Sequence, residues 1–333
     1  MHPGRYPLAR LRRNRRSPAI RAMVAETRLA PADLIWPIFL CAGVDREEPI
    51  AALPGVSRHS VDRVAALVGE AARLGIPCVA LFPNTPPALR SPDGAEALNP
   101  DNLVCRALRA AKAAEPGVAL LADVALDPYT SHGHDGLTDA AGRVLNDETV
   151  EVLMRQAVVQ AEAGADILAP SDMMDGRIQA IRRALDGAGH AEAAIMAYSA
   201  KYASGFYGPF REAVGASGLL KGDKRTYQMN PANAREAMAE MEQDLAEGAD
   251  SLMVKPGLAY LDVVARAAER FDAPVFAYCV SGEYAMVEAA AAAGMLDRDA
   301  LVIEILTAFK RAGAAGILTY HAPLAARLLR ETA

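Results

Sequence analysis

Eight short apolar runs recur along the chain, each bounded by Gly, Pro, Asn or Asp. Runs of this kind that end at turn-forming residues are typical of buried β-strands. The predicted strands are 34–40, 76–82, 119–126, 167–170, 194–199, 252–254, 275–280 and 316–320. Helical periodicity marks most of the segments between them, most clearly at 61–74, 149–163, 232–247 and 299–311. Strands that alternate with helices predict right-handed crossovers and a parallel sheet.

Four of the predicted helices end at a glycine that is followed by an apolar strand, at Gly75, Gly164, Gly248 and Gly313. Glycine just past a helix allows the left-handed residue that closes it. Eight such units in 333 residues fit a closed barrel better than an open doubly wound sheet, which is the alternative. No GxGxxG or GxxxxGK[ST] loop follows the first strand. The sequence therefore predicts a (β/α)8 TIM barrel over residues 31–333, preceded by an extended N-terminal arm over residues 1–30.

The predicted arm is strongly basic, although the whole chain has a net charge of −6. It carries Arg5, Arg10, Arg12, Arg13, Arg15, Arg16 and Arg21. A transit peptide and a nucleic-acid arm are disfavoured, because the segment has no apolar stretch, contains three prolines and precedes an acidic chain. We expect no nucleic-acid partner. We expect the arm to lie against acidic surface of a neighbouring subunit, and a disordered basic tail is the alternative.

Two further features indicate the class of protein. No apolar run approaches the roughly 20 residues needed to span a bilayer, so we expect no membrane association. The four cysteines are far apart and form no CxxC pair, which argues against a disulfide framework and a zinc ribbon. A reducing cytoplasm is the expected compartment.

Candidate catalytic groups should lie at the carboxyl ends of the barrel strands. Lys201 and Lys255 follow the fifth and sixth predicted strands, so both are expected in one mouth. Burial and mutual repulsion would disfavour their ammonium forms, and a neutral amine is the nucleophile that forms a Schiff base with a ketone or aldehyde. The alternative is that each lysine is an ordinary surface residue with a partly buried stem.

Two polar segments border this predicted site. Residues 202–227 combine five glycines with aromatic and cationic residues, including Arg211 and Lys221, which is typical of a lid that clamps a carboxylate. An ordinary surface loop is the alternative. Residues 123–136 cluster Asp and His, which would suit Mg²⁺ through Asp oxygens or a transition metal through His. A hydrogen-bonded loop without metal fits equally well.

Six strings in the chain resemble the porphobilinogen synthases (5-aminolevulinate dehydratases). They are RRNRRSP at 12–18, APSDMMDG at 169–176, YSAKYAS at 198–204, FYGPFR at 206–211, GADSLMVKPG at 248–257 and VSGE at 280–283. The resemblance covers nearly the whole chain. It implies a TIM-barrel lyase (hydro-lyase) of haem and other tetrapyrrole biosynthesis, which condenses two 5-aminolevulinate molecules and assembles as a homo-octamer or homo-hexamer.

The resemblance also implies roles for individual residues. Lys255 matches the lysine that forms the Schiff base with the first substrate, Lys201 matches the second lysine, and Asp123 lies beside them as a further catalytic group. The expected substrate-binding residues are Ser281 and Tyr320 for the first carboxylate, Arg211, Lys224 and Gln228 for the second, and also Ser171, Tyr198 and Phe206. The segment 202–227 matches the lid of the family.

Metal use is where the chain departs from part of the family. Zinc-dependent members carry three cysteines in the loop after the third strand, whereas this chain has Ala125, Asp127 and Asp135 there. A zinc ion held by thiolates is therefore not expected. Glu240 resembles a position where some members bind an allosteric Mg²⁺, although a lone Glu on a helix is more often simply solvated. Mg²⁺ is thus a candidate cofactor, either allosteric or not required.

Two other functions are compatible with the pattern. A Schiff-base aldolase would share the barrel and the lysine of the sixth strand, but it would need neither a second lysine nor a lid that clamps a carboxylate. A non-catalytic metabolite-binding barrel would leave both lysines without a purpose.

Overall fold

A closed ring of eight parallel strands forms the centre of the molecule. The computed structural model describes residues 4–216, 218–220 and 222–331. The ring contains β1 (Leu34–Cys41), β4 (Cys78–Pro83), β5 (Ala119–Val124), β6 (Ile167–Pro170), β7 (Ala194–Lys201), β8 (Ser251–Lys255), β9 (Val275–Cys279) and β10 (Gly316–Thr319). Pairing of β1 with β10 closes the ring, so the prediction of a TIM barrel is confirmed and the open sheet is wrong.

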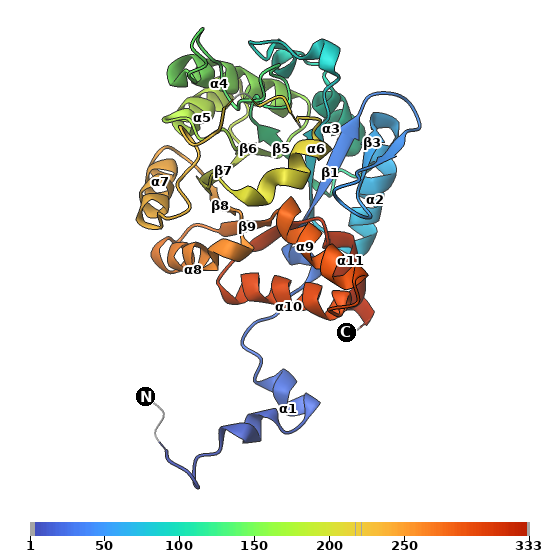
Figure 1. Ribbon diagram of the computed structural model, residues 1–333, viewed down its shortest axis with the longest axis vertical. Helices are drawn as coiled ribbons and strands as arrows, with labels where there is room; N and C mark the ends of the chain where they lie inside the picture. Colours follow the sequence, from blue (N-terminus) through green and yellow to red (C-terminus); the bar gives the residue numbers. More distant parts are fainter. Residues whose placement is uncertain (1–3, 217, 221, 332–333) are drawn as a thin grey trace.

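The helices surround this ring (Figure 1). They are α2 (Val64–Leu74), α3 (Leu103–Ala114), α4 (Asn146–Glu162), α5 (Arg177–Gly187), α7 (Arg235–Ala246), α8 (Leu261–Arg270), α9 (Ser281–Ala292), α10 (Arg298–Arg311) and α11 (Ala322–Glu331). The four predicted helices correspond to α2, α4, α7 and α10, with ends that differ by up to three residues. No helix in the described part of the chain is long and apolar enough to cross a membrane.

The glycines that were expected to end four helices do so. Gly75, Gly164, Gly248 and Gly313 have φ between 74° and 107°, in the region that residues with a side chain rarely adopt. Each glycine reverses the chain from a helix into the next strand. These turns repeat the same unit around the barrel.

One element beside the barrel was not predicted. The strands β2 (Glu47–Pro49) and β3 (Ser57–Ser60) form an antiparallel hairpin, and β3 pairs with the end of β1. Both strands are short and rich in polar residues, so they lack the apolar alternation that marks a strand in sequence.

Two apolar clusters stabilise the fold. One fills the space between the strands and the outer helices. The other lies inside the ring and includes Phe39, Phe82, Tyr198, Tyr278 and Tyr320. The interior of the barrel is thus rich in aromatic rings where it approaches the carboxyl ends of the strands. Strand side chains alternate in direction, so each strand contributes to both clusters.

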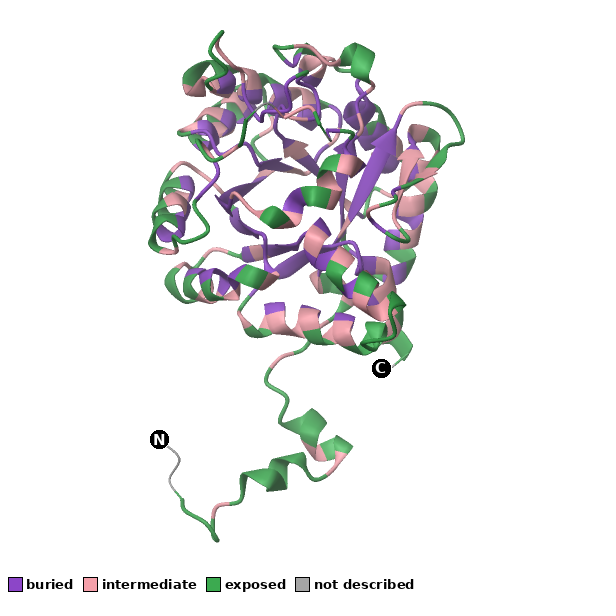
Figure 2. Cartoon of the chain, in the orientation of Figure 1, coloured by how far each residue is buried: buried purple, intermediate pink, exposed green. Residues whose placement is uncertain are grey.

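The N-terminal segment differs from the rest of the chain. It contains the short 3₁₀ helix η1 (Leu11–Arg15) and α1 (Pro18–Met23), and it extends away from the barrel (Figure 1). None of residues 4–30 is buried, in contrast to the strands (Figure 2). A segment without a buried residue gains little stability from its own chain.

Candidate functional site

The carboxyl ends of the barrel strands surround one small cavity. Its lining includes seven of the predicted site residues: Asp123, Ser171, Lys201, Arg211, Lys224, Gln228 and Lys255. Lys201 and Lys255 are direct neighbours in the pairing of β7 with β8, which explains why both side chains enter the same space. Each lysine is only 5% exposed. The predicted convergence of the two lysines is therefore what the structure shows.

Lys255 projects among aromatic rings. Its Nζ lies 4.6 Å from the ring centre of Tyr278, 4.8 Å from that of Phe210, 5.1 Å from that of Tyr198 and 5.6 Å from that of Tyr207. Burial, reinforced by the charge of Lys201, lowers the pKa of Lys255 to about 7. Near pH 7, a large fraction of the protein molecules therefore carry Lys255 as a neutral amine, which imine formation requires.

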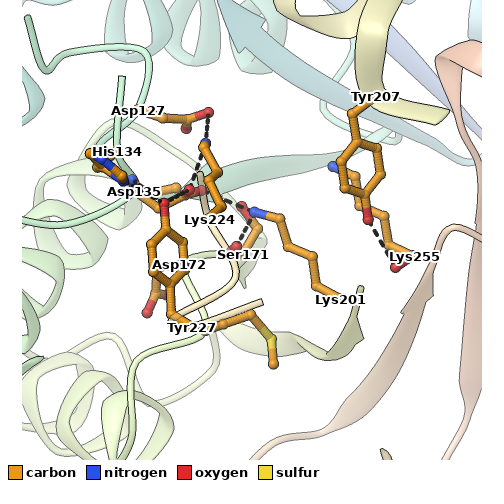
Figure 3. A network of polar contacts seen from close by, with 12 residues as sticks. Asp127, His134, Asp135, Ser171, Asp172, Lys201, Tyr207, Lys224, Tyr227 and Lys255 are labelled. Carbon is orange, nitrogen blue, oxygen red and sulfur yellow. Dashed lines mark hydrogen bonds and ion pairs between the residues drawn. The ribbon is translucent and has the colours of Figure 1, made fainter. Parts of the chain in front are cut away.

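Lys201 projects to the polar side of the same cavity (Figure 3). Its Nζ donates to Oδ1 of Asp135 at 3.0 Å and also to the main-chain carbonyl of Ser171. The Asp135 carboxylate is fully buried, so its contact with Lys201 is an ion pair shielded from water. The two lysines thus occupy opposite electrostatic environments although their strands are adjacent.

Asp135 is the centre of a polar network. Its carboxylate contacts Nζ of Lys224 at 2.6 Å and accepts a hydrogen bond of 2.9 Å from the hydroxyl of Tyr227 (Figure 3). Burial opposes ionisation of Asp135, but the ammonium groups of Lys201 and Lys224 outweigh it and lower its pKa. Lys224 also contacts Asp127 at 3.2 Å. The predicted polar loop is therefore held by hydrogen bonds and ion pairs with Lys201 on β7 and with Lys224 and Tyr227 of the lid segment.

The pKa of Asp123, at the end of β5, is shifted in the opposite direction from that of Asp135. Burial raises its pKa to about 6, and the charges of Lys255 and Lys201 limit the rise. Its Oδ1 atom is buried without a hydrogen-bond partner in the described structure. A carboxyl group whose pKa is raised toward neutral and that borders both lysines can exchange protons with them.

The expected lid covers the cavity. It contains the 3₁₀ helix η6 (Gly205–Tyr207) and α6 (Gly208–Ala213), which lies over one end of the barrel next to α9 (Figure 1). Arg211 lines the cavity but is exposed. Lys221, expected in the same lid, lies outside the described residues. The free volume of the cavity is about 40 Å³, well below the roughly 300 Å³ at which small-molecule sites usually begin, so we expect the lid to move when a substrate enters.

Four predicted substrate-binding residues lie behind this cavity rather than on its lining. The ring of Tyr198 lies beside the Nζ of Lys255. The Tyr320 hydroxyl is 2.9 Å from that of Tyr278. The Ser281 hydroxyl accepts from the backbone N–H of Phe210 and donates to the carbonyl of Phe206, so Ser281 and Phe206 bind each other.

Sequence reasoning expected Tyr198 at the site but missed the ring of Tyr278 beside Lys255. Tyr278 precedes the end of its strand by one residue, and alternation along β9 could have placed it inside the barrel. Tyr207 was expected only as part of the lid, yet its hydroxyl donates to the carbonyl of Lys255 at 3.0 Å. This bond attaches the lid to the main chain of the lysine itself.

Glu240 is separate from the two lysines. It lies on α7 and lines a larger cavity together with Asp175 and Glu236. Burial raises its pKa, while the charge of Arg177 opposes that rise. These are oxygen ligands of the kind that Mg²⁺ prefers. Within residues 4–216, 218–220 and 222–331, however, no group of three or more His, Cys, Asp or Glu side chains is arranged to hold a metal.

Comparison with known proteins agrees with this geometry. A model of the delta-aminolevulinic acid dehydratase family matches residues 8–328. The delta-aminolevulinic acid dehydratase of Bradyrhizobium diazoefficiens is 60% identical over 321 residues, which cover 96% of this chain and 91% of the relative. The one from Rhodobacter capsulatus is 51% identical over 324 residues, 97% of each chain.

A solved structure extends the likeness to three dimensions. The crystal structure of delta-aminolevulinic acid dehydratase (porphobilinogen synthase) from Toxoplasma gondii ME49, in complex with the reaction product porphobilinogen, matches with a TM-score of 0.95 and 50% identity. The match covers 98% of this chain and 92% of that one. The chain therefore belongs to the delta-aminolevulinic acid dehydratase family.

Proposed function

We propose that this lyase condenses two molecules of 5-aminolevulinate into porphobilinogen, and that Lys255 starts the reaction. The observation that supports this proposal most strongly is the pair of buried lysines at the ends of β7 and β8. One lysine lies among aromatic rings and the other is ion-paired. The amine of Lys255 attacks the ketone carbon of the first substrate, and loss of water gives the imine.

Lys201 acts on the second substrate in this proposal. Its position next to Lys255 brings the two bound molecules together, which favours their condensation over diffusion apart. Asp123, with a pKa of about 6, carries protons between the lysines and the substrates. Ser171 contributes the main-chain carbonyl that orients Lys201.

The carboxylates of the substrates require two anion sites. We assign the second to Arg211, Lys224 and Gln228, which line the cavity from the lid side. The first falls to Ser281 and Tyr320, near the rings of Tyr198 and Tyr278. The Ser281 hydroxyl is hydrogen-bonded to the lid backbone at Phe206 and Phe210. It can bind the substrate only after these bonds break, which agrees with the need for lid movement.

We propose that catalysis does not use zinc. Asp127 and Asp135, which stand where zinc-dependent members have cysteines, are both bound by the ammonium group of Lys224. A lysine in contact with both carboxylates supplies positive charge there and leaves little room for a metal ion. The acidic residues near Glu240 supply oxygen ligands of the kind that Mg²⁺ prefers, and there we assign the ion the part of an effector rather than a reactant.

We further propose that the N-terminal arm holds a homo-oligomer together, either an octamer or a hexamer, in the cytoplasm. None of the described arm residues is buried, and their arginines form no ion pair with an acidic residue in the described chain. Their guanidinium groups suit an acidic surface on another subunit. Four free cysteines, all buried, suit a reducing compartment.

The test is direct. Purified protein is incubated with 5-aminolevulinate, and the product is assayed with an Ehrlich-type reagent that detects pyrroles. Colour that increases with time supports the proposal. Cleavage or formation of carbon–carbon bonds with aldehyde substrates, without any pyrrole, would instead show an aldolase.

Assembly is tested separately by removal of residues 1–17. The truncated protein should sediment as a smaller particle than the full chain over a range of concentrations. An unchanged particle mass would contradict the role of the arm, whatever the activity.

A further inference from the structure

Two arginines from distant parts of the chain hold the end of the lid helix α6. They are Arg58 on β3 and Arg90, just after the 3₁₀ helix η4 (Pro87–Leu89). Both guanidinium groups contact main-chain carbonyls at or just beyond the carboxyl end of α6. The sequence analysis predicted a functional role for neither arginine.

Arg58 binds the last two residues of α6. Its Nε donates to the carbonyl of Ala213 at 2.7 Å, and its Nη2 donates to that of Glu212 at 2.5 Å. The arginine side chain is 14% exposed, and its remaining charged neighbour is Glu48 on β2 at 3.8 Å. The unpredicted β2–β3 hairpin therefore has a specific task, because it carries this arginine to the lid.

Arg90 binds the next two residues. Its Nη2 donates to the carbonyl of Val214 and its Nη1 to that of Gly215, both at 2.9 Å, while its Nε donates to Thr85 within its own loop. Gly215 has a φ of 65°, and a side-chain carbon there would lie 2.2 Å from the amide oxygen of Asn84. This glycine allows the lid backbone to approach the Arg90 loop.

Four consecutive carbonyls, from residue 212 to residue 215, thus each accept a hydrogen bond from a guanidinium group. The last carbonyls of a helix have no partner within the helix. Charged donors satisfy them more strongly than water or neutral groups do. Because α6 has only six residues, its own hydrogen bonds cannot fix its position, so it depends on external contacts such as these.

The clamped segment also forms part of the substrate cavity. Phe210 and Arg211 on α6, and Val214 and Ala216 just after it, all line that cavity. The amide of Ala216 donates back to the carbonyl of Arg211 at 2.7 Å, so the turn held by the arginines is bonded to the residue assigned to the second carboxylate. A shift of this turn would move Arg211 relative to Lys224 and Lys255.

We propose that Arg58 and Arg90 are positioning residues that clamp the closed lid and so set the affinity for the second substrate. They touch neither lysine, and their effect acts through α6. This inference rests on the proposed function for its kinetic consequence, but the clamp itself is a statement about the lid that is measurable without substrate.

The experiment compares the full-length wild type with Arg58→Ala, Arg90→Ala and the double variant. Arg63→Ala is the matched control, since Arg63 follows the same hairpin but binds only Asp45 and Glu47 at the surface. Hydrogen exchange of the amides of Val214, Gly215 and Ala216 is measured without substrate. We expect each single variant to raise exchange of these amides about tenfold or more, and the control to leave it unchanged.

The second readout separates the two substrates. The 5-aminolevulinate concentration for half-maximal pyrrole formation should rise about tenfold in the single variants. The concentration for half-maximal borohydride trapping on Lys255 should change much less, because the carbonyls held by the two arginines lie beyond Phe210, the residue of α6 beside Lys255. Arg90→Lys should recover part of the loss, since an ammonium group can satisfy one of the two carbonyls.

Unchanged lid exchange in a folded double variant would overturn the clamp. So would a loss of pyrrole formation in which trapping falls equally and half-saturation stays constant, because that pattern indicates general destabilisation. If the wild type makes no pyrrole at all, the proposed function fails while the exchange result still decides the clamp.

Discussion

Two sides of one cavity give two neighbouring lysines different properties. On one side Lys255 is surrounded by aromatic rings, and burial lowers its pKa to about 7. On the other side Lys201 is ion-paired with the buried carboxylate of Asp135. Residue type and strand position are the same for both, so the surrounding side chains make Lys255 the proposed nucleophile.

The comparison explains how one substrate is used in two ways. In the proposed function, the aromatic side offers an amine that is largely neutral near pH 7, which favours imine formation with the first molecule. The ion-paired side offers fixed positive charge for the second molecule and its carboxylate. The lid joins the two sides, because Tyr207 binds the main chain of Lys255 while Lys224 binds Asp135.

The largest expected effect comes from removal of the nucleophile. Lys255→Ala and Lys255→Arg should each lower pyrrole formation by about 1,000-fold or more, because a guanidinium group stays protonated and cannot attack a carbonyl. The rate of pyrrole formation under saturating 5-aminolevulinate is the measurement. Appreciable turnover by the Lys255→Arg variant would exclude this residue as the nucleophile.

Removal of the carboxylate on the other side should act mainly on stability. Asp135→Asn leaves Lys201 and Lys224 as buried cations without their shared partner, at a cost of about 3 kcal/mol in the free energy of unfolding. Chemical denaturation followed by circular dichroism measures it. Asp127→Asn is the control, since Asp127 contacts only Lys224 in the described structure and should cost less. Equal losses in the two variants would refute the central position of Asp135.

A smaller effect is expected from Arg211→Ala. Loss of a charge-assisted contact with the second carboxylate should weaken binding by about 1.5 kcal/mol, which raises KM roughly tenfold. Imine trapping on Lys255 should remain close to that of the wild type. Steady-state kinetics together with borohydride trapping test this prediction, and unchanged kinetics would remove Arg211 from the site.

The smallest effect is expected from zinc removal. A zinc-selective chelator should leave activity unchanged, because the ammonium group of Lys224 holds Asp127 and Asp135. Treatment with EDTA and separate addition of Mg²⁺, K⁺ and Zn²⁺ measures the dependence. Activity that is lost and then restored by Zn²⁺ alone would contradict this view of the loop. Restoration by Mg²⁺ together with a larger particle would support a role for Glu240 between subunits.

Much of the fold was predictable because it depends on local patterns. All eight barrel strands coincide with apolar runs, and the four glycine turns lie where helices were expected to end. The convergence of Lys201 and Lys255 followed from their places at the ends of adjacent parallel strands. These inferences need only the periodicity of apolar residues along the chain and the rule that the carboxyl ends of barrel strands lie at one end of the barrel.

What could not be predicted depends on contacts between distant residues. Asp135 and Lys201 are 66 positions apart, and nothing local distinguishes Asp135 from Asp127. Arg58 and Ala213 are 155 positions apart, and the polar hairpin that carries Arg58 has no strand pattern. Which lysine has the lower pKa also depends on rings from several strands, so it becomes apparent only when the barrel is assembled.

The most direct test of the central claim is the pH dependence of imine trapping. The protein is mixed with 5-aminolevulinate and borohydride at a series of pH values, and the adduct is located by mass spectrometry. The pKa of about 7 predicts that trapping on Lys255 falls about tenfold per pH unit below 7 and levels off above it, because only the unprotonated amine attacks. Lys255 should carry the first adduct at every pH. First labelling of Lys201, or a rate that still rises steeply above pH 9, would contradict the account.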